Sequence, residues 1–394
     1  MNVSKPYLDK AFELKDRASE PERLYITAHY YADNGQLEKG NAAYELYKQT
    51  YPREITPYVN LGVTYLNLGE FDKALANAQE AMRVDPDESR GYGNAAQAYQ
   101  GLNRPEEAKT VLRAGLQRNP GFTFLHDALA TIAYAQGDLA EMEKQETFLY
   151  NQPDLEMSLN SRHGDIAASH GQIQKAREFY EKGRQIAQRL QLKDSEAGYL
   201  LAEAYALAMF GNSKRAIEAC NAALALAPSF NIMGYITQVL AFAGENKRAL
   251  ELTSLEVHER ADDTLIQAIY VPANQATVAL NTGDARKALE LMRPALSYDK
   301  ANTISLYVRG MAYLKAGDGT GAAGEFQKVL ALYDYAPTDL LMPFARLGLA
   351  RAFALQGDTA KAKSAYQDIL GFWKDADPDL PTIKQVKSEY AKLQ

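Results

Sequence analysis

The feature that most constrains this chain is a series of turn residues about 34 positions apart. Gly35, Gly69, Gly137 and Gly171 follow a strict 34-residue spacing, and the one position missing from it is occupied by Asn103. Asn is the residue that best replaces Gly where φ is positive. The series continues, at steps of 33 to 40 residues, with Gly211, Gly244, Gly283, Gly317 and Gly357. A period of this length is typical of stacked supersecondary units, so we expect a repeat architecture.

A second series, of small residues, lies five positions after each turn. At eight of the ten turns this residue is Ala, in a chain where 62 of 394 residues are Ala: Ala74, Ala108, Ala176, Ala216, Ala249, Ala288, Ala322 and Ala362. Gly40 and Met142 fill the other two positions. Small residues at a fixed period predict helices that pack closely together.

A third series consists of prolines, which cannot continue a helix. Its members are Pro52, Pro86, Pro120 and Pro153, and Pro228 plays the same part later. Each unit is therefore predicted to run helix, Gly turn, helix, Pro break, with helices of about 14 residues, roughly 20 Å long.

Residues 55–88 illustrate the unit. Tyr58, Leu61, Gly62 and Tyr65 lie at i, i+3, i+4 and i+7, which is one face of a helix. We expect Gly62, with Ala74 on the second helix, to let the paired helices approach closely. One hairpin cannot bury its apolar face alone, but stacked neighbours can.

With aromatic, Leu, Gly, Tyr, Gly, Ala, Ala and Pro at these offsets, the unit resembles the tetratricopeptide repeat. The resemblance is strong over 21–122, clear over 303–376 and weaker over 123–302. It implies an all-α solenoid of about ten helical hairpins in a right-handed superhelix, whose concave face is lined by the first helix of each unit. It also implies binding of another protein or an extended peptide. We divide the chain into an orphan helix (1–20), an N-terminal array (21–156), divergent repeats (157–302), a C-terminal pair (303–376) and a capping helix (377–394).

Several stretches carry a narrower resemblance. YVRGMAYLKAG (307–317), the segment 349–381 and the segment 51–76 resemble the C-terminal repeat region of bacterial, acidobacterial-type serine/threonine kinases. That resemblance implies the sensory or interaction arm of a signalling kinase. Similar repeat regions also follow winged-helix DNA-binding domains, so a transcriptional regulator is an alternative. Self-association, or an intramolecular regulatory role, is a further one.

The two ends of the chain differ. Residues 5–18 stand where a second helix of a hairpin belongs, with Leu8, Ala11, Phe12 and Leu14 on the apolar face and no first helix before them. We expect a chain cut from a longer one; the alternative is a natural protein whose lone first helix is its cap. After Trp373, the sequence TIKQVKSEYAKLQ predicts a final polar-faced capping helix.

Composition and motifs argue against several classes of function. A net charge of −7 argues against a nucleic-acid surface. No apolar run approaches a membrane span and the N-terminus has no signal-peptide core, so we expect no direct membrane insertion and a cytoplasmic location. An extracytoplasmic location is the alternative if a membrane segment precedes the chain. The kinase motif set is absent, so this chain alone is not expected to be an enzyme.

Three isolated features are predicted to be structural. GTGAAG (319–324) fits a dinucleotide-loop pattern, but a predicted helix rather than a strand precedes it. His163 and His170 are two helical turns apart, too far to share a metal ion readily. Cys220 occupies a small-residue position, which favours a buried packing role. We therefore expect no cofactor and no metal.

The predicted ligand surface is the concave face of the first three full repeats. Asn60 and Asn94 occupy the same position of successive first helices, where in tetratricopeptide proteins an Asn often bonds the backbone of an extended peptide. The same face is predicted to carry Tyr25, His29, Val63, Arg90 and Gln97. Tyr25 and His29 stand where the carboxylate clamp of chaperone-binding relatives has Lys and Asn, so an internal segment is preferred over a free C-terminus. The alternative is that both Asn side chains bond neighbouring helix backbones.

Overall fold

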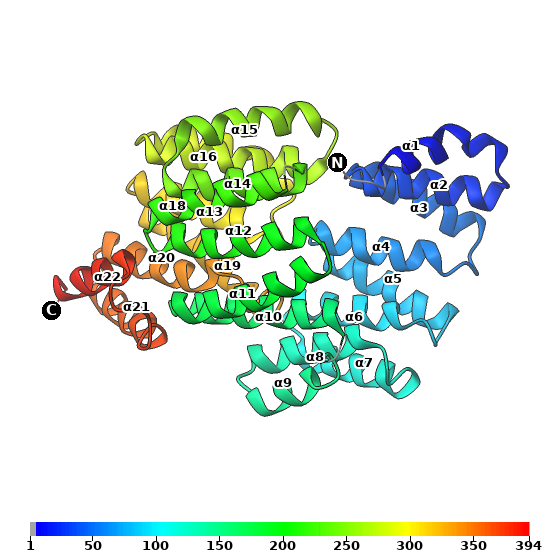
Figure 1. Cartoon of the computed structure of the whole chain (residues 1–394), viewed down its shortest axis with the longest axis horizontal. Coiled ribbons are helices and arrows are strands. Elements are labelled where there is room, and N and C mark those ends of the chain that lie inside the picture. The colour runs from blue at the N-terminus through cyan, green and yellow to red at the C-terminus, as the bar shows by residue number, and fades with distance from the viewer. Residues whose placement is uncertain (1–4, 151, 228, 394) are drawn as a thin grey trace. The chain divides into compact units, whose positions relative to one another are not determined.

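The computed structural model describes residues 5–150, 152–227 and 229–393, and over these ranges the chain is helical with no strand (Figure 1). The predicted all-α fold is confirmed for them. Pro228, one of the predicted breaks, lies outside the described residues.

Twenty of the helices pair into ten hairpins across the described ranges, and successive hairpins pack on one another within each of the two units described below. They are α2 (Glu20–Asp33) and α3 (Leu37–Thr50), α4 (Thr56–Asn67) and α5 (Phe71–Val84), α6 (Ser89–Gly101) and α7 (Pro105–Arg118), α8 (Thr123–Ala135) and α9 (Leu139–Glu146), α10 (Pro153–Ser169) and α11 (Ile173–Arg189), α12 (Lys193–Met209) and α13 (Ser213–Leu226), α14 (Phe230–Ala243) and α15 (Asn246–Glu259), α16 (Val271–Asn281) and α17 (Ala285–Leu291), α18 (Thr303–Lys315) and α19 (Gly319–Ala331), α20 (Leu341–Leu355) and α21 (Thr359–Phe372). Single helices flank them, α1 (Lys5–Leu14) and α22 (Pro381–Ala391). Short turns of other helix types lie at Lys15–Arg17, Ile266–Tyr270 and Arg293–Ser297.

The hairpin turns have the predicted backbone conformation. All nine glycines of the series have φ between +68° and +89°, and Asn103 has φ of +56°. Side chains other than Gly and Asn are disfavoured there, which is why the turns can be read from the sequence. Gln191, with φ of +59°, makes a similar turn that the sequence analysis missed, between α11 and α12.

The second series forms the closest packing in the core. Each of its eight alanines is at most 1% exposed, and Met142 is 5% exposed. Gly62 corrects one expectation, since a Cβ there would lie 2.7 Å from Nδ2 of Asn94. Its missing side chain therefore makes room for α6 of the next hairpin, and not for the paired helix α5.

The proline series is confirmed at three positions and wrong at one. Pro52, Pro86 and Pro120 each follow the end of a helix by two residues. Pro153 instead begins α10, seven residues after α9 has ended at Glu146. Proline is well tolerated at a first helical position because its missing N–H has no partner there in any helix.

The chain forms two compact units. Unit 1 comprises Met1–Leu149 with the short segments Arg260–Gln267 and Tyr298–Ala301, and unit 2 comprises Tyr150–Glu259, Ala268–Ser297 and Asn302–Gln394. In unit 1, the backbone N–H of Thr264 donates to the carbonyl of Gly35 (2.9 Å). The Lys300 ammonium donates to Glu70 (2.7 Å), so both short segments pack on hairpin turns.

In unit 2, the segment after α21 packs on the turns of two much earlier hairpins. The Trp373 indole N–H donates to the carbonyl of Ser169 (2.9 Å), and the backbone N–H of Asp377 donates to that of Gly171 (3.0 Å). The rings of Phe210, Phe344 and Trp373 pack edge to face, with centroids 5.0–5.4 Å apart. The contacts made by Ser169, Gly171 and Phe210 join residues more than 130 positions apart in sequence, and they link α20 and the end of α21 to the turns that follow α10 and α12.

Each flanking helix packs on the helix beside it. In α1, the Phe12 ring stacks on Tyr30 of α2 with centroids 3.8 Å apart. The helix ends at Leu14, and a 3₁₀ turn covers three of the four remaining residues that were predicted as helix. In α22, Val386 is fully buried, so the polar-faced cap also carries a packed apolar side.

Candidate functional site

The predicted surface lies on α2, α4 and α6 of unit 1. Tyr25 and Val63 are each 42% exposed, and Arg90 is exposed and pairs with Glu88 (2.8 Å). The Tyr25 ring lies 4.2 Å from that of His29. Burial lowers the pKa of His29, against a smaller opposing effect of Asp33, so its imidazole is neutral at pH 7.

The two asparagines of this surface use their amide nitrogens within the protein. Asn94 is 5% exposed and donates from Nδ2 to the carbonyl of Val59 (2.9 Å). Asn60 is half-buried and donates from Nδ2 to the carbonyl of Thr56 in its own helix (3.0 Å). Asn94 thus bonds a neighbouring helix backbone, as the alternative interpretation expected, whereas Asn60 bonds the backbone of its own helix. The side chains most available to a ligand are therefore Tyr25, Val63 and Arg90, while Gln97 is half-buried.

The features predicted to be structural lie in packed surroundings. Cys220 is fully buried, and burial raises the pKa of its thiol to about 12, which disfavours the reactive thiolate. His163 stacks on Phe179 and His170 on Phe372. Within the described ranges, no three His, Cys, Asp or Glu side chains come together as a metal site.

GTGAAG is part of a helix and not a loop. Its six residues open α19, where the Asp318 carboxylate accepts a hydrogen bond from the N–H of Gly321 (2.8 Å). The preceding element is α18, so the strand that a dinucleotide loop requires is replaced by a helix. Ala322 within it is fully buried, as its place in the repeat predicts.

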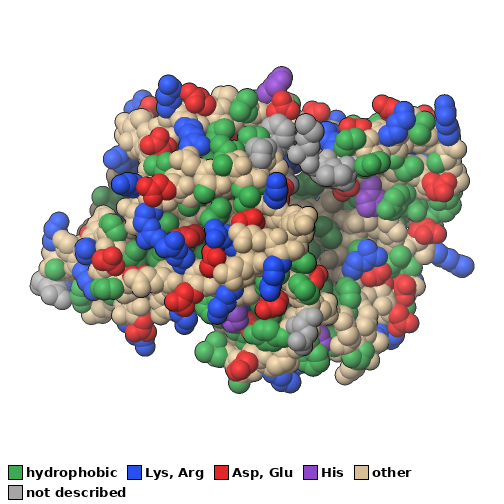
Figure 2. All heavy atoms as spheres, in the orientation of Figure 1, with side chains coloured by type: hydrophobic (Ala, Val, Ile, Leu, Met, Phe, Trp, Pro, Cys, Tyr) green, Lys and Arg blue, Asp and Glu red, His purple; other side chains and the backbone are tan. Residues whose placement is uncertain are grey.

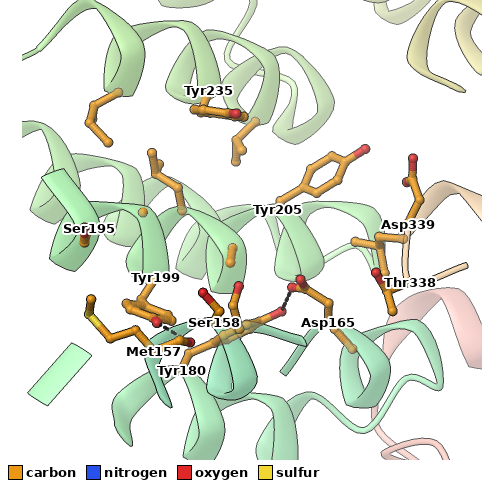
Figure 3. A pocket seen from close by; sticks show the side chains of 18 of the residues that line it. Met157, Ser158, Asp165, Tyr180, Ser195, Tyr199, Tyr205, Tyr235, Thr338 and Asp339 are labelled. Carbon is orange, nitrogen blue, oxygen red and sulfur yellow. Dashed lines mark hydrogen bonds between the residues drawn. The ribbon is translucent and has the colours of Figure 1, made fainter. Parts of the chain in front are cut away.

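A pocket that the sequence analysis did not predict lies in unit 2 (Figure 3). Its volume is about 800 Å³, and it is bounded by one face each of α10, α12 and α14 and by the segment 336–340 before α20. The polar and aromatic side chains that line it are Asp154, Ser158, Ser161, Asp165, Tyr180, Asp194, Ser195, Tyr199, Tyr205, Tyr235, Gln238, Thr338 and Asp339.

Two glycines position the tyrosines at the base of this pocket. A Cβ at Gly164 would lie 2.3 Å from the Tyr180 ring, and one at Gly183 would lie 2.3 Å from the Tyr199 ring. Tyr180 donates its hydroxyl hydrogen to Asp165 (2.8 Å), whereas Tyr199 donates to the carbonyl of Met157 (2.7 Å). Both bonds are drawn in Figure 3.

The described residues that line the pocket include acidic side chains and no basic ones. Burial raises the pKa of Asp165 to about 7, the bond from Tyr180 opposes that rise, and the charge of Asp339 adds to it. Burial also raises the pKa of Asp339, despite bonds from Thr303 and from the backbone of Leu341. None of the described residues that line the pocket is Lys, Arg or His.

Comparison with protein families identifies the repeat. Three family models, each described as a tetratricopeptide repeat, match residues 65–132, 274–337 and 344–371. The chain contains tetratricopeptide repeats. The first match lies within the predicted N-terminal array, and the last two cover most of the predicted C-terminal pair.

Curated relatives match most of the chain at low identity. The DnaJ homolog subfamily C member 7 homolog of Schizosaccharomyces pombe is 25% identical over 351 residues, which are 85% of this chain and 65% of that protein. The TPR repeat-containing protein MJ1428 of Methanocaldococcus jannaschii is 21% identical over 78% of this chain and 54% of its own length. The chain thus spans between half and two thirds of these relatives.

Solved structures match along most of the chain but superpose loosely. The crystal structure of yeast Tom70 covers 99% of this chain and 96% of its own, at a TM-score of 0.35 and 14% identity. The P58(IPK) TPR domain covers 98% of each chain at a TM-score of 0.27 and 14% identity. At these scores the superpositions do not bear on the pocket.

The surface and the helices add two observations. On the face drawn in Figure 2, Lys and Arg side chains alternate with Asp and Glu, and no basic stripe forms among the described residues in view. Within the described part of the chain, no helix has the length and apolar character needed to cross a bilayer.

Proposed function

We propose that this chain is a binding scaffold, and that its unit 2 pocket receives an extended segment of another protein. The observation that carries the proposal is the pocket itself, about 800 Å³ bounded by the first helices of three successive hairpins. Ligand sites of this size combine aromatic walls with a few fixed polar groups. Tetratricopeptide repeats are generally associated with protein binding, which supports a peptide as the occupant.

The lining suits a polypeptide main chain. Ser158 and Ser195 are exposed at the pocket, and each hydroxyl can both donate and accept a hydrogen bond. Tyr235 is 64% exposed and offers a broad aromatic surface to a side chain. Gly198 lies on α12 with nothing within 4 Å of where its Cβ would be, so a ligand can approach the helix backbone there.

Unit 1 supplies a second proposed contact surface, centred on Tyr25, Val63 and Arg90. Two of these side chains are exposed apolar or aromatic groups, and the third is a guanidinium, a combination common in protein interfaces. The positions of a carboxylate clamp hold Tyr25 and His29, which supports an internal segment as the ligand.

A narrower proposal concerns the biological setting. We propose that the chain is the interaction arm of a signalling protein, such as a serine/threonine kinase, with a winged-helix regulator as the alternative. The support is the sequence resemblance of 51–76, 307–317 and 349–381, and sequencing the flanking region of the source gene tests it directly.

Panning a phage-displayed library of random heptapeptides on the full chain tests the pocket. Gly198→Phe should fill the pocket and abolish retention of the selected peptides. Gly371→Phe is the matched control, because Gly371 is also an exposed helical glycine with open space at its Cβ, on α21 away from the pocket. Equal retention by both variants would contradict the pocket as the binding site.

Self-association is tested separately by light scattering during size-exclusion chromatography. A monomer at all concentrations supports a ligand-binding scaffold. A concentration-dependent dimer that Gly198→Phe disrupts would mean that the pocket holds a second copy of the chain, and would contradict the proposal.

A further inference from the structure

We propose that the segment entering the unit 2 pocket presents a cationic side chain, Arg or Lys, to Asp165. This inference rests on the proposed function and deepens it by naming the chemistry of the ligand. It stands on the geometry of the Asp165 carboxyl, on the hydroxyl of Tyr205 and on the absence of basic residues among the described residues that line the pocket.

Asp165 is held in place without being neutralised. One of its carboxyl oxygens accepts the hydrogen bond from Tyr180, and within the described ranges the other has no hydrogen-bond partner (Figure 3). Tyr180 is itself 3% exposed and packs against Gly164, so its hydroxyl holds the Asp165 carboxyl in one orientation. The second oxygen is left for a donor that comes from the pocket.

Tyr205 offers a second acceptor within the pocket lining. Its ring packs at 5.9 Å from that of Phe242, and its hydroxyl has no hydrogen-bond partner among the described residues. In Figure 3 the hydroxyl end points toward the side where Asp339 and Thr338 lie. A guanidinium carries five N–H groups in a planar fork, so an Arg held at Asp165 keeps donors for other acceptors of the pocket.

The other three aspartates that line the pocket contribute negative charge rather than free hydrogen-bond acceptors. Asp339 accepts hydrogen bonds at both oxygens, from Thr303 and from the N–H of Leu341 at the start of α20. Asp154 and Asp194 lie in the first turns of α10 and α12, where acidic residues are favoured by the helix dipole. Their structural roles account for their presence, and their negative charge still favours a cation at Asp165.

Elsewhere in unit 2 a partly buried acid has its own cation. Glu389 on α22 receives two hydrogen bonds from the Arg351 guanidinium, at 2.9 and 3.0 Å. Burial by itself would raise the pKa of Glu389, but the bonds and charge of Arg351 hold it below its ordinary value. Asp165 is also buried, but no Arg or Lys lies beside it among the described residues that line the pocket. We therefore expect the ligand to supply the cation.

The test compares the peptides that the wild-type chain and Asp165→Asn retain from the random heptapeptide library. Asn keeps an acceptor for the Tyr180 hydroxyl, while it removes the charge and replaces the second oxygen with an NH2 group. Asp368→Asn is the control, because Asp368 is exposed on α21. The proposal expects Arg or Lys enrichment with wild type and Asp368→Asn, and none with Asp165→Asn.

A direct measurement follows on one selected peptide. Replacing its Arg with citrulline, the neutral isostere, should weaken binding to wild type about tenfold, as for loss of a charge-assisted hydrogen bond. Asp165→Asn should reduce that difference to less than threefold. If Asp165→Asn fails to fold, Tyr205→Phe serves as the second variant and should also narrow the difference.

The outcomes separate the two proposals. Peptides that Gly198→Phe excludes, but that lack basic residues or bind Asp165→Asn equally well, would overturn the cationic ligand and leave the proposed function standing. Failure of the library to yield any peptide that Gly198→Phe excludes would overturn the pocket as a peptide site, and this inference with it.

Discussion

Asp165→Asn should stabilise the ligand-free chain at pH 8 and leave its stability nearly unchanged at pH 4. Burial raises the pKa of the Asp165 carboxyl to about 7, while in the unfolded chain it has an ordinary value near 3.8. Between these two values the native state binds more protons than the unfolded state. The free energy of unfolding therefore falls as pH rises from about 4 to about 7, and the loss is complete above pH 7.

The size of the effect follows from the same two values. A rise from 3.8 to about 7 corresponds to about 4 kcal/mol at 1.36 kcal/mol per pH unit. The carboxyl borders an open pocket, and water there solvates its free oxygen, so we expect a net gain of about 1–3 kcal/mol for Asp165→Asn at pH 8. The Asn carbonyl retains the hydrogen bond from Tyr180.

The assay is urea unfolding at pH 4, 5, 6, 7 and 8, followed by helical circular dichroism. The difference in midpoint between Asp165→Asn and wild type should grow with pH and level off above 7. Asp339, whose pKa burial also raises, leaves a residual pH dependence of the same sign in the variant. Asp368→Asn, an exposed control, should follow the wild-type curve.

Parallel curves of unfolding midpoint against pH for wild type and Asp165→Asn would refute the reasoning, because they would mean that folding does not disfavour the charged form of this carboxyl. A midpoint difference of the opposite sign would mean that the charged form is compensated inside the protein. In either case the argument for a cationic ligand would lose its main support. Selected peptides should also bind wild type more tightly at pH 8 than at pH 5, since the ionised carboxylate is the form that attracts a cation.

Three further substitutions test the packing. Gly69→Val should lower stability by about 1–3 kcal/mol in thermal melts, because φ is +68° there; an unchanged melt would contradict the turn. Asn94→Ala should cost about 1 kcal/mol in urea unfolding by removing the bond to Val59; weaker peptide binding at unchanged stability would instead favour a ligand role. Trp373→Ala should cost about 3–5 kcal/mol, and hydrogen exchange should show the turn at Ser169 opening; unchanged protection there would rule out this contact as a clamp.

The hairpins could be predicted because each turn depends on the conformation of one residue. Gly35 and Asn103 need positive φ, and few residue types tolerate it, so the sequence carries a visible mark at each turn. The buried Ala five positions later is equally local, since it lies where the second helix of the hairpin begins. Pro153 was misread because a proline fits both after a helix and at the start of one.

The pocket could not be predicted, because its parts are far apart in sequence and share no motif. Asp165 and Asp339 are 174 positions apart, and their approach depends on small rotations accumulated over the intervening hairpins. The contact between Trp373 and Ser169 that helps to hold them depends on the same rotations. Gly164 carried a signal, as a mid-helix glycine with a packing reason, but its partner Tyr180 appears only in three dimensions.

Asp165 also links the stability of the free chain to ligand binding. A buried carboxyl without a cation lowers the stability of the free chain, and many substitutions at that position would remove the cost. Arg351 and Glu389 show that unit 2 can place a guanidinium against a partly buried acid where stability is the only requirement. A ligand cation at Asp165 would restore the lost stability on binding, because a ligand that binds only the folded state stabilises it. The lower stability of the free chain and the preference for a cationic segment are then two consequences of the same carboxylate.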